Sequence, residues 1–128
     1  MKIINPKLFH PANGHYSQAI EHNGIIYISG QLPLDPENDN LIPQGIRSQT
    51  ELVLQKLDSI LLTAGSNRNQ VIQVKIYIHG INHWSEVNEV YTSFFGSHKP
   101  VRCIIPVPEL HYGALIELEA TAVTGSKS

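Results

Sequence analysis

Cysteine is almost absent from this 128-residue chain, which contains only Cys103. A single cysteine excludes an intrachain disulfide and a zinc site built from several thiolates, and it suits the reducing cytosol. The seven histidines show no HExxH motif or other recognisable metal-ligand spacing. We therefore expect a cytoplasmic protein without a metal site.

Long apolar runs are also absent, and none approaches the roughly 18 residues that a membrane span requires. Residues 1–15 lack the continuous apolar segment of a secretory signal. The formal net charge is −2 and the basic residues form no cluster, so nothing indicates nucleic-acid binding. With 41% hydrophobic and 16% charged residues, the composition predicts one globular domain over residues 1–128.

Four segments have the alternating pattern of β-strands. They are Tyr16–His22, Ile25–Gln31, Val71–His79 and Ala114–Val123. Asn23-Gly24, between the first two, is a strong hairpin signal because both turn positions need a positive φ. A shorter run, Arg102–Ile105, stops at Pro106 and Pro108, which suit an edge strand or an irregular connection.

Two segments have helical spacing. Gly45–Ala64 carries an apolar stripe and is followed by Gly65, a natural C-terminal stop. His83–Phe95 is the second, and either Asn82 or Ser85 is placed to cap it. The resulting order, ββαβαββ, predicts an α+β domain.

Each predicted strand has one aliphatic and one mixed face. The aliphatic faces carry Ile26, Ile28, Ile72, Val74, Ile76, Ile78, Ile116, Leu118, Ala120 and Ala122. The mixed faces carry Tyr27, Ser29, Gln31, Gln73, Lys75, Tyr77, His79, Glu117, Glu119, Thr121 and Val123. We expect two amphipathic helices to cover the aliphatic face. The mixed face then meets either water, which an antiparallel sheet tolerates, or other subunits.

Arg102 lies in an apolar run, and Glu117 and Glu119 alternate through the aliphatic strand that follows. Burying an unpaired charge is costly, so these groups must reach water, pair with each other or await a ligand. A planar guanidinium can hold a carboxylate through two parallel hydrogen bonds. The alternatives for Arg102 are a surface position or an internal ion pair.

These segments together resemble the reactive intermediate deaminase family, also called Rid, YjgF or L-PSP proteins. The similarity rests on Tyr16-Ser17-Gln18-Ala19, Tyr27–Pro36, the Leu57…Ala64-Gly65 helix end, Val87–Phe95, Pro100-x-Arg102 and Ile116–Val123. Each piece is weak alone, but their order and spacing are specific. The resemblance implies a chorismate-mutase-like fold, with a mixed sheet, two helices on one face and a homotrimer with clefts between subunits.

The resemblance further implies hydrolysis of reactive 2-imino or enamine acids, such as 2-aminoacrylate, to 2-keto acids and ammonia without a cofactor. Arg102 matches the arginine that holds the substrate carboxylate, and Glu117 matches a glutamate that positions substrate or water. Three residues match the lining of the pocket: Tyr16, Ser29 and Gly30. We interpret Cys103 as a pocket-wall residue whose backbone N–H can reach the ligand, because no His/Asn partner marks it as a nucleophile.

Asn88 and Tyr91 match a helix motif of the family and are expected to be architectural. Gly14-His15 departs from the family's usual Gly-Pro, and His111 lies in a loop near the site where many relatives have another residue. Two other functions stay open. One is a non-catalytic sensor of small keto or amino acids. The other is an endoribonuclease, which the acidic charge balance and the lack of paired histidines disfavour.

Overall fold

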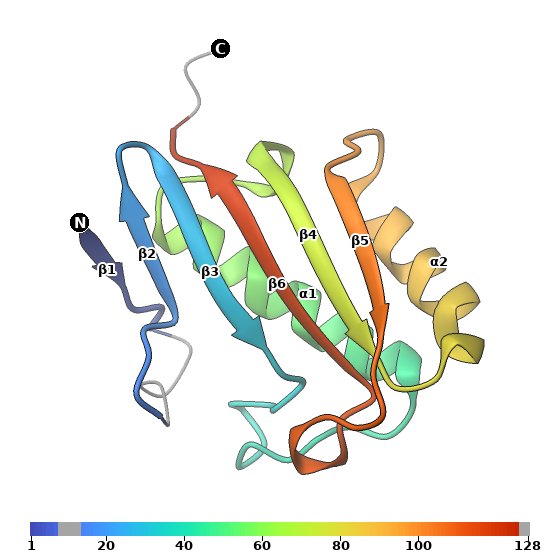
Figure 1. The fold of residues 1–128 in the computed structure, drawn as a ribbon. Helices are drawn as coiled ribbons and strands as arrows, with labels where there is room; N and C mark the ends of the chain where they lie inside the picture. The colour runs from blue at the N-terminus through green and yellow to red at the C-terminus, as the bar shows by residue number, and fades with distance from the viewer. Residues whose placement is uncertain (8–13, 126–128) are drawn as a thin grey trace.

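The computed structural model describes residues 1–7 and 14–125 and has two layers, a six-stranded sheet and a pair of helices packed on one of its faces (Figure 1). The strands are β1 Lys2–Ile4, β2 Ala19–His22, β3 Ile25–Gln31, β4 Val71–Ile78, β5 Val101–Pro106 and β6 Ile116–Val123. Their order across the sheet is β1-β2-β3-β6-β4-β5. The β4–β5 pair is parallel and the other pairs are antiparallel. The predicted α+β fold with a mixed sheet is therefore confirmed.

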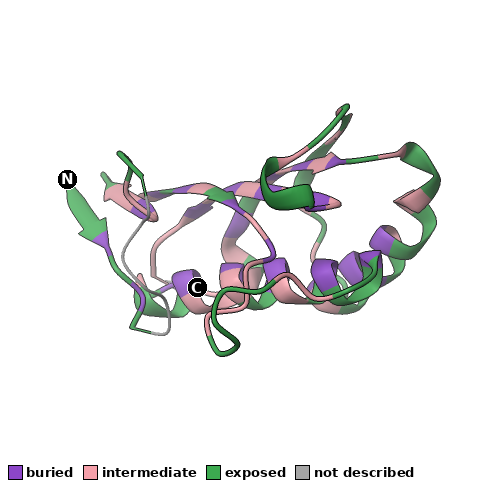
Figure 2. Cartoon of the chain, turned by 90° about the horizontal axis from the view of Figure 1, so that it is seen from below, coloured by how far each residue is buried: buried purple, intermediate pink, exposed green. Residues whose placement is uncertain are grey.

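The helices α1, Ile46–Thr63, and α2, Trp84–Phe95, bury their apolar stripes against the sheet. Figure 2 shows the buried residues concentrated between the two layers. Short 3₁₀ turns η1 Arg68–Gln70, η2 Ile81–His83 and η3 His111–Gly113 connect the elements. Within the described ranges, no helix has both the length and the apolarity needed to cross a bilayer.

The expected side-chain cap of α2 was wrong. The η2 turn leads directly into α2, so His83 occupies the cap position with near-helical angles and makes no side-chain cap bond. The hairpin prediction was right, since Asn23 and Gly24 have φ of 53° and 81°. The edge prediction was also right, because β5 pairs only with β4 among the described strands.

Two features of the strands were not predicted. The strand β1 is too short to show an alternating pattern, and it pairs with β2 at the other edge of the sheet. The strand β2 begins at Ala19, so residues 16–18 approach the sheet as an irregular segment.

Two β-bulges change which residues face the core. In β4 the register shifts between Val71 and Gln73, so Val71 is buried while Ile72 is 43% exposed, against our expectation. In β3 the shift lies between Ile28 and Gln31, which turns Gln31 from the mixed face into the interior, where it is 2% exposed. A bulge adds one residue to a strand and so reverses the alternation beyond it.

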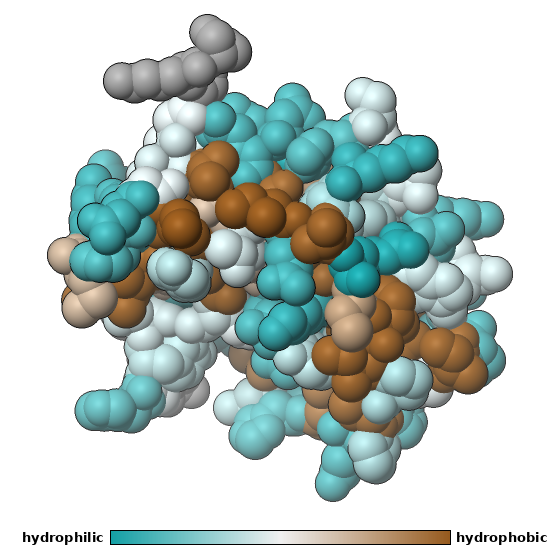
Figure 3. Space-filling view, turned by 45° about the horizontal axis from the view of Figure 1, so that its top comes forward, coloured by the Kyte–Doolittle hydropathy of each residue, from teal (hydrophilic) through white to brown (hydrophobic). Residues whose placement is uncertain are grey.

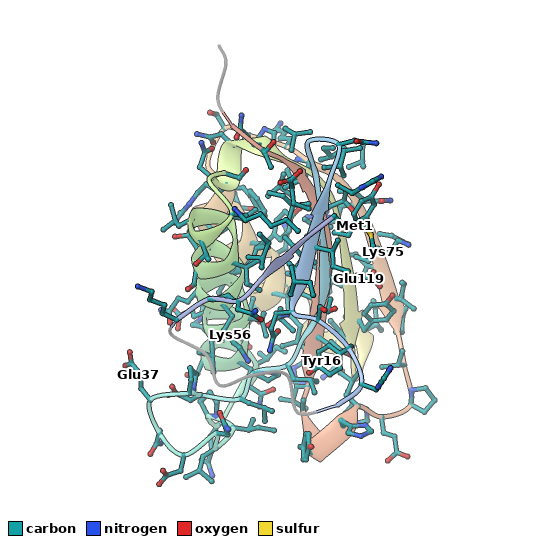
Figure 4. The ribbon with its side chains drawn as sticks, turned by 90° about the vertical axis from the view of Figure 1, so that its left-hand side faces the viewer. Met1, Tyr16, Glu37, Lys56, Lys75 and Glu119 are labelled. Atoms are coloured by element: carbon teal, nitrogen blue, oxygen red, sulfur yellow. The ribbon has the colours of Figure 1, made fainter. Side chains whose placement is uncertain are left out.

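The open face of the sheet, the face away from the helices, carries the remaining mixed positions. These are Tyr27, Gln73, Lys75, Tyr77, Glu117, Glu119 and Thr121. Figure 3 shows that hydrophobic residues on this side of the molecule gather in patches separated by hydrophilic ones. Figure 4 shows Lys75 and Glu119 on the side of the sheet opposite α1.

Candidate functional site

A cavity of about 650 Å³ opens at the end of the sheet where β6 begins. Its walls come from the segment before β2, the end of β3 with the loop that follows, the η3 loop and β6, which meet at the bottom of Figure 1. The lining residues are Gly14, Tyr16, Ser29, Gly30, Leu32, Leu34, Glu109, Leu110, His111, Tyr112 and Glu117. We call this space the Glu117 cavity. It brings together Tyr16, Ser29, Gly30 and Glu117, four of the six predicted site residues.

The contact between Gly30 and Glu117 explains why a glycine occurs inside β3. A Cβ atom at position 30 would lie 2.6 Å from Glu117 Oε2 and 3.1 Å from its carboxyl carbon. The φ of Gly30 is not in the left-handed region, so the glycine is needed for space and not for its backbone conformation. The carboxylate of Glu117 thus lies directly over the β3 backbone.

The hydroxyl of Ser29 ties the Tyr16 segment to the sheet. Ser29 Oγ donates to the Ser17 carbonyl at 2.6 Å, and the Ser29 amide donates to the Gln18 carbonyl at 3.0 Å. These bonds hold the residues that directly follow Tyr16, whose side chain is half exposed at the cavity and is labelled in Figure 4. Ser29 therefore has a structural bond in addition to its place in the lining.

The two glutamates of β6 differ in their environments. The Tyr77 hydroxyl donates to Glu119 Oε1, and this hydrogen bond, with burial, raises the pKa of Tyr77 to about 12. Within the described part of the chain Glu117 makes no hydrogen bond or ion pair. Burial raises the pKa of Glu117, the nearby Glu119 carboxylate raises it further, and His111 lowers it. Glu117 is thus the β6 carboxylate left available to a water or ligand.

Arg102 lies outside the Glu117 cavity. In β5 it is in register with Val74, whose side chain is buried beneath the helices, so the Arg102 side chain turns toward α2. Its Nη1 donates to Asn88 Oδ1 at 3.0 Å, and its Cζ lies 4.7 Å from the Trp84 ring centroid and 4.9 Å from that of Tyr91. Asn88 and the two aromatic rings thus fix the guanidinium without neutralising it.

The three arginines of the chain differ in their counter-charges. Arg47 pairs with Glu86 and Glu89, and Arg68 pairs with Asp58 at 3.2 Å. No carboxylate pairs with Arg102 in the part of the chain that the structure describes. The internal ion pair that the sequence allowed is therefore not formed there, and the charge of Arg102 remains available to an anionic group.

Cys103 lies next to Arg102 on the opposite side of β5. It is in register with Lys75, faces the open side of the sheet and is exposed. Neither Arg102 nor Cys103 lines the Glu117 cavity of the same chain. One chain therefore presents the predicted site in two parts, a carboxylate cavity and an arginine on the edge strand.

Several lining residues were not identified from the sequence. Leu32, Leu34, Leu110 and Tyr112 stand in loops without a periodic pattern, so only the fold brings them to the cavity. The residues that surround Arg102 could have been identified from a sequence pattern. Trp84, Asn88 and Tyr91 are spaced i, i+4, i+7, which places them on one side of a helix.

The chain is similar in sequence to a known protein family. Residues 9–124 match the family described as endoribonuclease L-PSP. The chain is 36% identical to the mouse 2-iminobutanoate/2-iminopropanoate deaminase, over 97% of this chain and 92% of the mouse protein.

Two solved structures superpose closely on the chain. A Rid family protein from Yersinia pestis is 39% identical, with a TM-score of 0.92 over 96% of this chain and 98% of its own. Escherichia coli TdcF with bound serine is 30% identical, with a TM-score of 0.92 over 98% of this chain and 100% of its own. The profile match, these identities and the shared fold lead to one conclusion: the chain belongs to the L-PSP, or Rid, family.

Proposed function

We propose that this protein hydrolyses reactive 2-imino acids, formed from enamines such as 2-aminoacrylate, to 2-keto acids and ammonia. The observation that carries the proposal is the half-buried Glu117 carboxylate, which lies in a cavity of about 650 Å³ and has no hydrogen-bond partner within the described chain. Several mammalian relatives, at 36–38% identity, are named for this reaction on 2-iminobutanoate and 2-iminopropanoate.

The mechanism needs an anchor for the substrate carboxylate, and among the described residues of one chain no arginine or lysine lines the Glu117 cavity. We propose a homotrimer in which β5 of a neighbouring subunit brings Arg102 to the mouth of the Glu117 cavity. The guanidinium then holds the substrate carboxylate, and the backbone N–H of Cys103 assists it. That TdcF binds serine, a small amino acid, is consistent with such an anchor.

In the proposed reaction the substrate is the protonated iminium, C=NH2+, and Glu117 takes a proton from a water molecule as the water oxygen adds to the C=N carbon. The tetrahedral intermediate then releases ammonia and leaves the 2-keto acid. Imines are electrophilic and hydrolyse without help, so orientation of the water and stabilisation of charge suffice for a useful acceleration. The proposed reaction requires no metal or organic cofactor.

An assay of ammonia and keto-acid release tests the proposal. An amino-acid oxidase or a serine/threonine dehydratase would generate the imines in situ from a panel of parent amino acids, and the rate without the protein would be subtracted. We expect the wild type to accelerate release and Glu117→Gln to lose most of the acceleration. Glu51→Gln, on the exposed side of α1, is the matched control and should keep it.

Two further measurements, of keto-acid binding and of RNA cleavage, test the two rival functions. Saturable binding of keto acids without faster ammonia release would indicate a sensor instead of an enzyme. RNA cleavage that disappears in Arg102→Ala would favour the endoribonuclease activity named in the family description. The formal net charge of −2 provides no electrostatic attraction for RNA.

A further inference from the structure

The η3 turn places an imidazole at the Glu117 cavity. His111 lines this cavity together with two carboxylates, Glu109 and Glu117. Of the described lining residues, His111 is the one whose side chain can carry a positive charge at neutral pH. Six positions separate His111 from Glu117 in the chain, and the fold turns both toward one space.

The backbone holds this turn in an unusual conformation. Tyr112 has φ 61° and ψ 20°, in the left-handed region that residues other than glycine seldom occupy. The Ala114 amide donates to the His111 carbonyl at 3.1 Å. Residues held in this conformation cluster at functional sites.

The chain after the turn is fixed from two sides. Buried Gln49 of α1 accepts a hydrogen bond from the Leu115 amide at 2.8 Å, and the Leu115 carbonyl accepts one from the His79 amide at 2.9 Å. His111 is thus presented from an anchored turn and not from a free loop. A fixed position is what proton transfer to a bound intermediate requires.

The proposed reaction also needs a proton donor for its leaving nitrogen. After water adds, the amine nitrogen of the tetrahedral intermediate must gain a proton before it can leave as ammonia. Glu117 then holds the proton of the attacking water, and His111, on the η3 wall of the same cavity, is a second group that can donate one. Imidazole is the side chain that readily exchanges a proton between pH 5 and 8.

We propose that His111 is a second catalytic residue of the Glu117 cavity, and that it protonates the departing nitrogen. This inference rests on the proposed function. The imidazolium gives its proton to the amine nitrogen, the C–N bond breaks, and ammonia leaves while a lone pair of the hydroxyl oxygen forms the C=O bond. The hydroxyl proton then returns to the imidazole, and Glu117 releases its proton to water.

The test measures kcat/KM for imine hydrolysis against pH in the wild type, His111→Gln, His111→Ala and the control His22→Gln. His22 is exposed at the hairpin end of β2, away from the cavity. We expect His111→Gln to lose at least about tenfold in kcat/KM, since general acid catalysis contributes about 10²–10⁴-fold. We also expect it to lose the fall in activity on the alkaline side, and added imidazole to restore part of the activity of His111→Ala.

Other ionisable groups around the cavity also contribute to the pH profile. Glu117 from β6, Glu109 from the same loop, and Tyr16 and Tyr112 line the space that His111 faces, and Glu119 lies beside Glu117. A His111→Gln enzyme with the wild-type rate and profile would overturn this inference alone. So would a loss of activity without a changed profile and without rescue by imidazole. A wild type that does not accelerate imine hydrolysis would overturn both this inference and the proposed function.

Discussion

At the scale of single residues, the Gly30–Glu117 contact gives the most direct test of the carboxylate. Gly30→Ala keeps an allowed backbone conformation but places a methyl carbon only 2.6 Å from Glu117 Oε2, closer than the two atoms can approach. The flexible carboxylate can move aside, so we expect the free energy of unfolding to change by less than about 1 kcal/mol. Displacing a catalytic group by about 1 Å can cost on the order of 10²-fold in rate, and we expect a loss of at least tenfold in kcat/KM.

A double-mutant cycle provides the control for Gly30. In a Glu117→Ala background the added methyl group has no carboxylate to displace, so Gly30→Ala should then change little further. If the two losses in kcat/KM simply multiply, Gly30 acts on activity by another route, and our reading of the contact is wrong.

Substitutions of Arg102 test the proposed carboxylate anchor. An anchoring interaction of this kind contributes roughly 1.5–3 kcal/mol, or about one to two powers of ten in binding. We expect Arg102→Ala to leave the protein folded but nearly abolish imine hydrolysis and keto-acid binding. Arg102→Lys should fall between, because it keeps the charge and loses the planar fork.

The control for Arg102 is Arg47→Ala, since Arg47 is exposed and already paired with carboxylates. It should keep wild-type activity. Keto-acid binding can be followed by calorimetry and folding by circular dichroism. An Arg102→Ala protein that is folded and fully active would show that the carboxylate is held elsewhere.

At the scale of elements, Lys56 connects α1 to the loop that walls the Glu117 cavity. Its Nζ donates to the carbonyls of Leu32 at 2.9 Å and Leu34 at 3.2 Å, and Figure 4 shows it in the layer of α1. Burial lowers the pKa of Lys56 from its ordinary 10.5 to about 8, while Asp35 opposes this shift. The anchor of the loop is therefore also sensitive to pH.

The sign of this pH dependence follows from linkage. Between pH 8 and 10.5 the unfolded chain keeps a proton on Lys56 that the folded chain has released. The free energy of unfolding should therefore rise with pH in this range. Tyr77 acts in the opposite direction above pH 10, because its pKa is raised from 10.0 to about 12 in the folded state.

Urea unfolding at several values between pH 8 and 10 measures this slope. Lys56→Met should flatten the slope of unfolding free energy against pH, whereas Lys99→Met, at an exposed lysine, should leave the slope unchanged. An identical slope in wild type and Lys56→Met would mean that Lys56 is not the group responsible.

At the scale of the whole molecule, the open face of the sheet predicts self-association. It carries charged and aromatic side chains, and both α1 and α2 lie on the other side of the sheet (Figure 1). We expect light scattering at micromolar concentration to give three times the 14.3 kDa mass of the chain. A monomer at that concentration would remove the intersubunit site and the mechanism with it.

A charge reversal on this face tests the interface. Lys75 is paired across strands with Glu119, so Lys75→Glu places two like charges opposite each other. We expect this variant to shift toward monomer and lose imine hydrolysis together. Glu51→Lys, on the exposed side of α1, should leave both the mass and the activity unchanged. A fully trimeric Lys75→Glu protein would contradict the proposed interface.

The amino-acid sequence alone determined the elements and their class. Periodicity identified both helices and the long strands, and Asn23-Gly24 fixed the first hairpin, because these signals depend on neighbours in the chain. The ordered motifs also identified the family, which the profile match over residues 9–124 confirms. The convergence of Tyr16, Ser29, Gly30 and Glu117 followed from that resemblance and not from the strand pattern.

Tertiary structure alone decided the rest. The bulges that bury Gln31 and expose Ile72 arise from pairing with β6, and pairing depends on residues distant in sequence. The surroundings of Arg102 and the turn that brings His111 to the cavity depend likewise on packing between elements. Local patterns report which side of a strand or helix is apolar, but the partner of a charged side chain is set by which elements the fold places beside it.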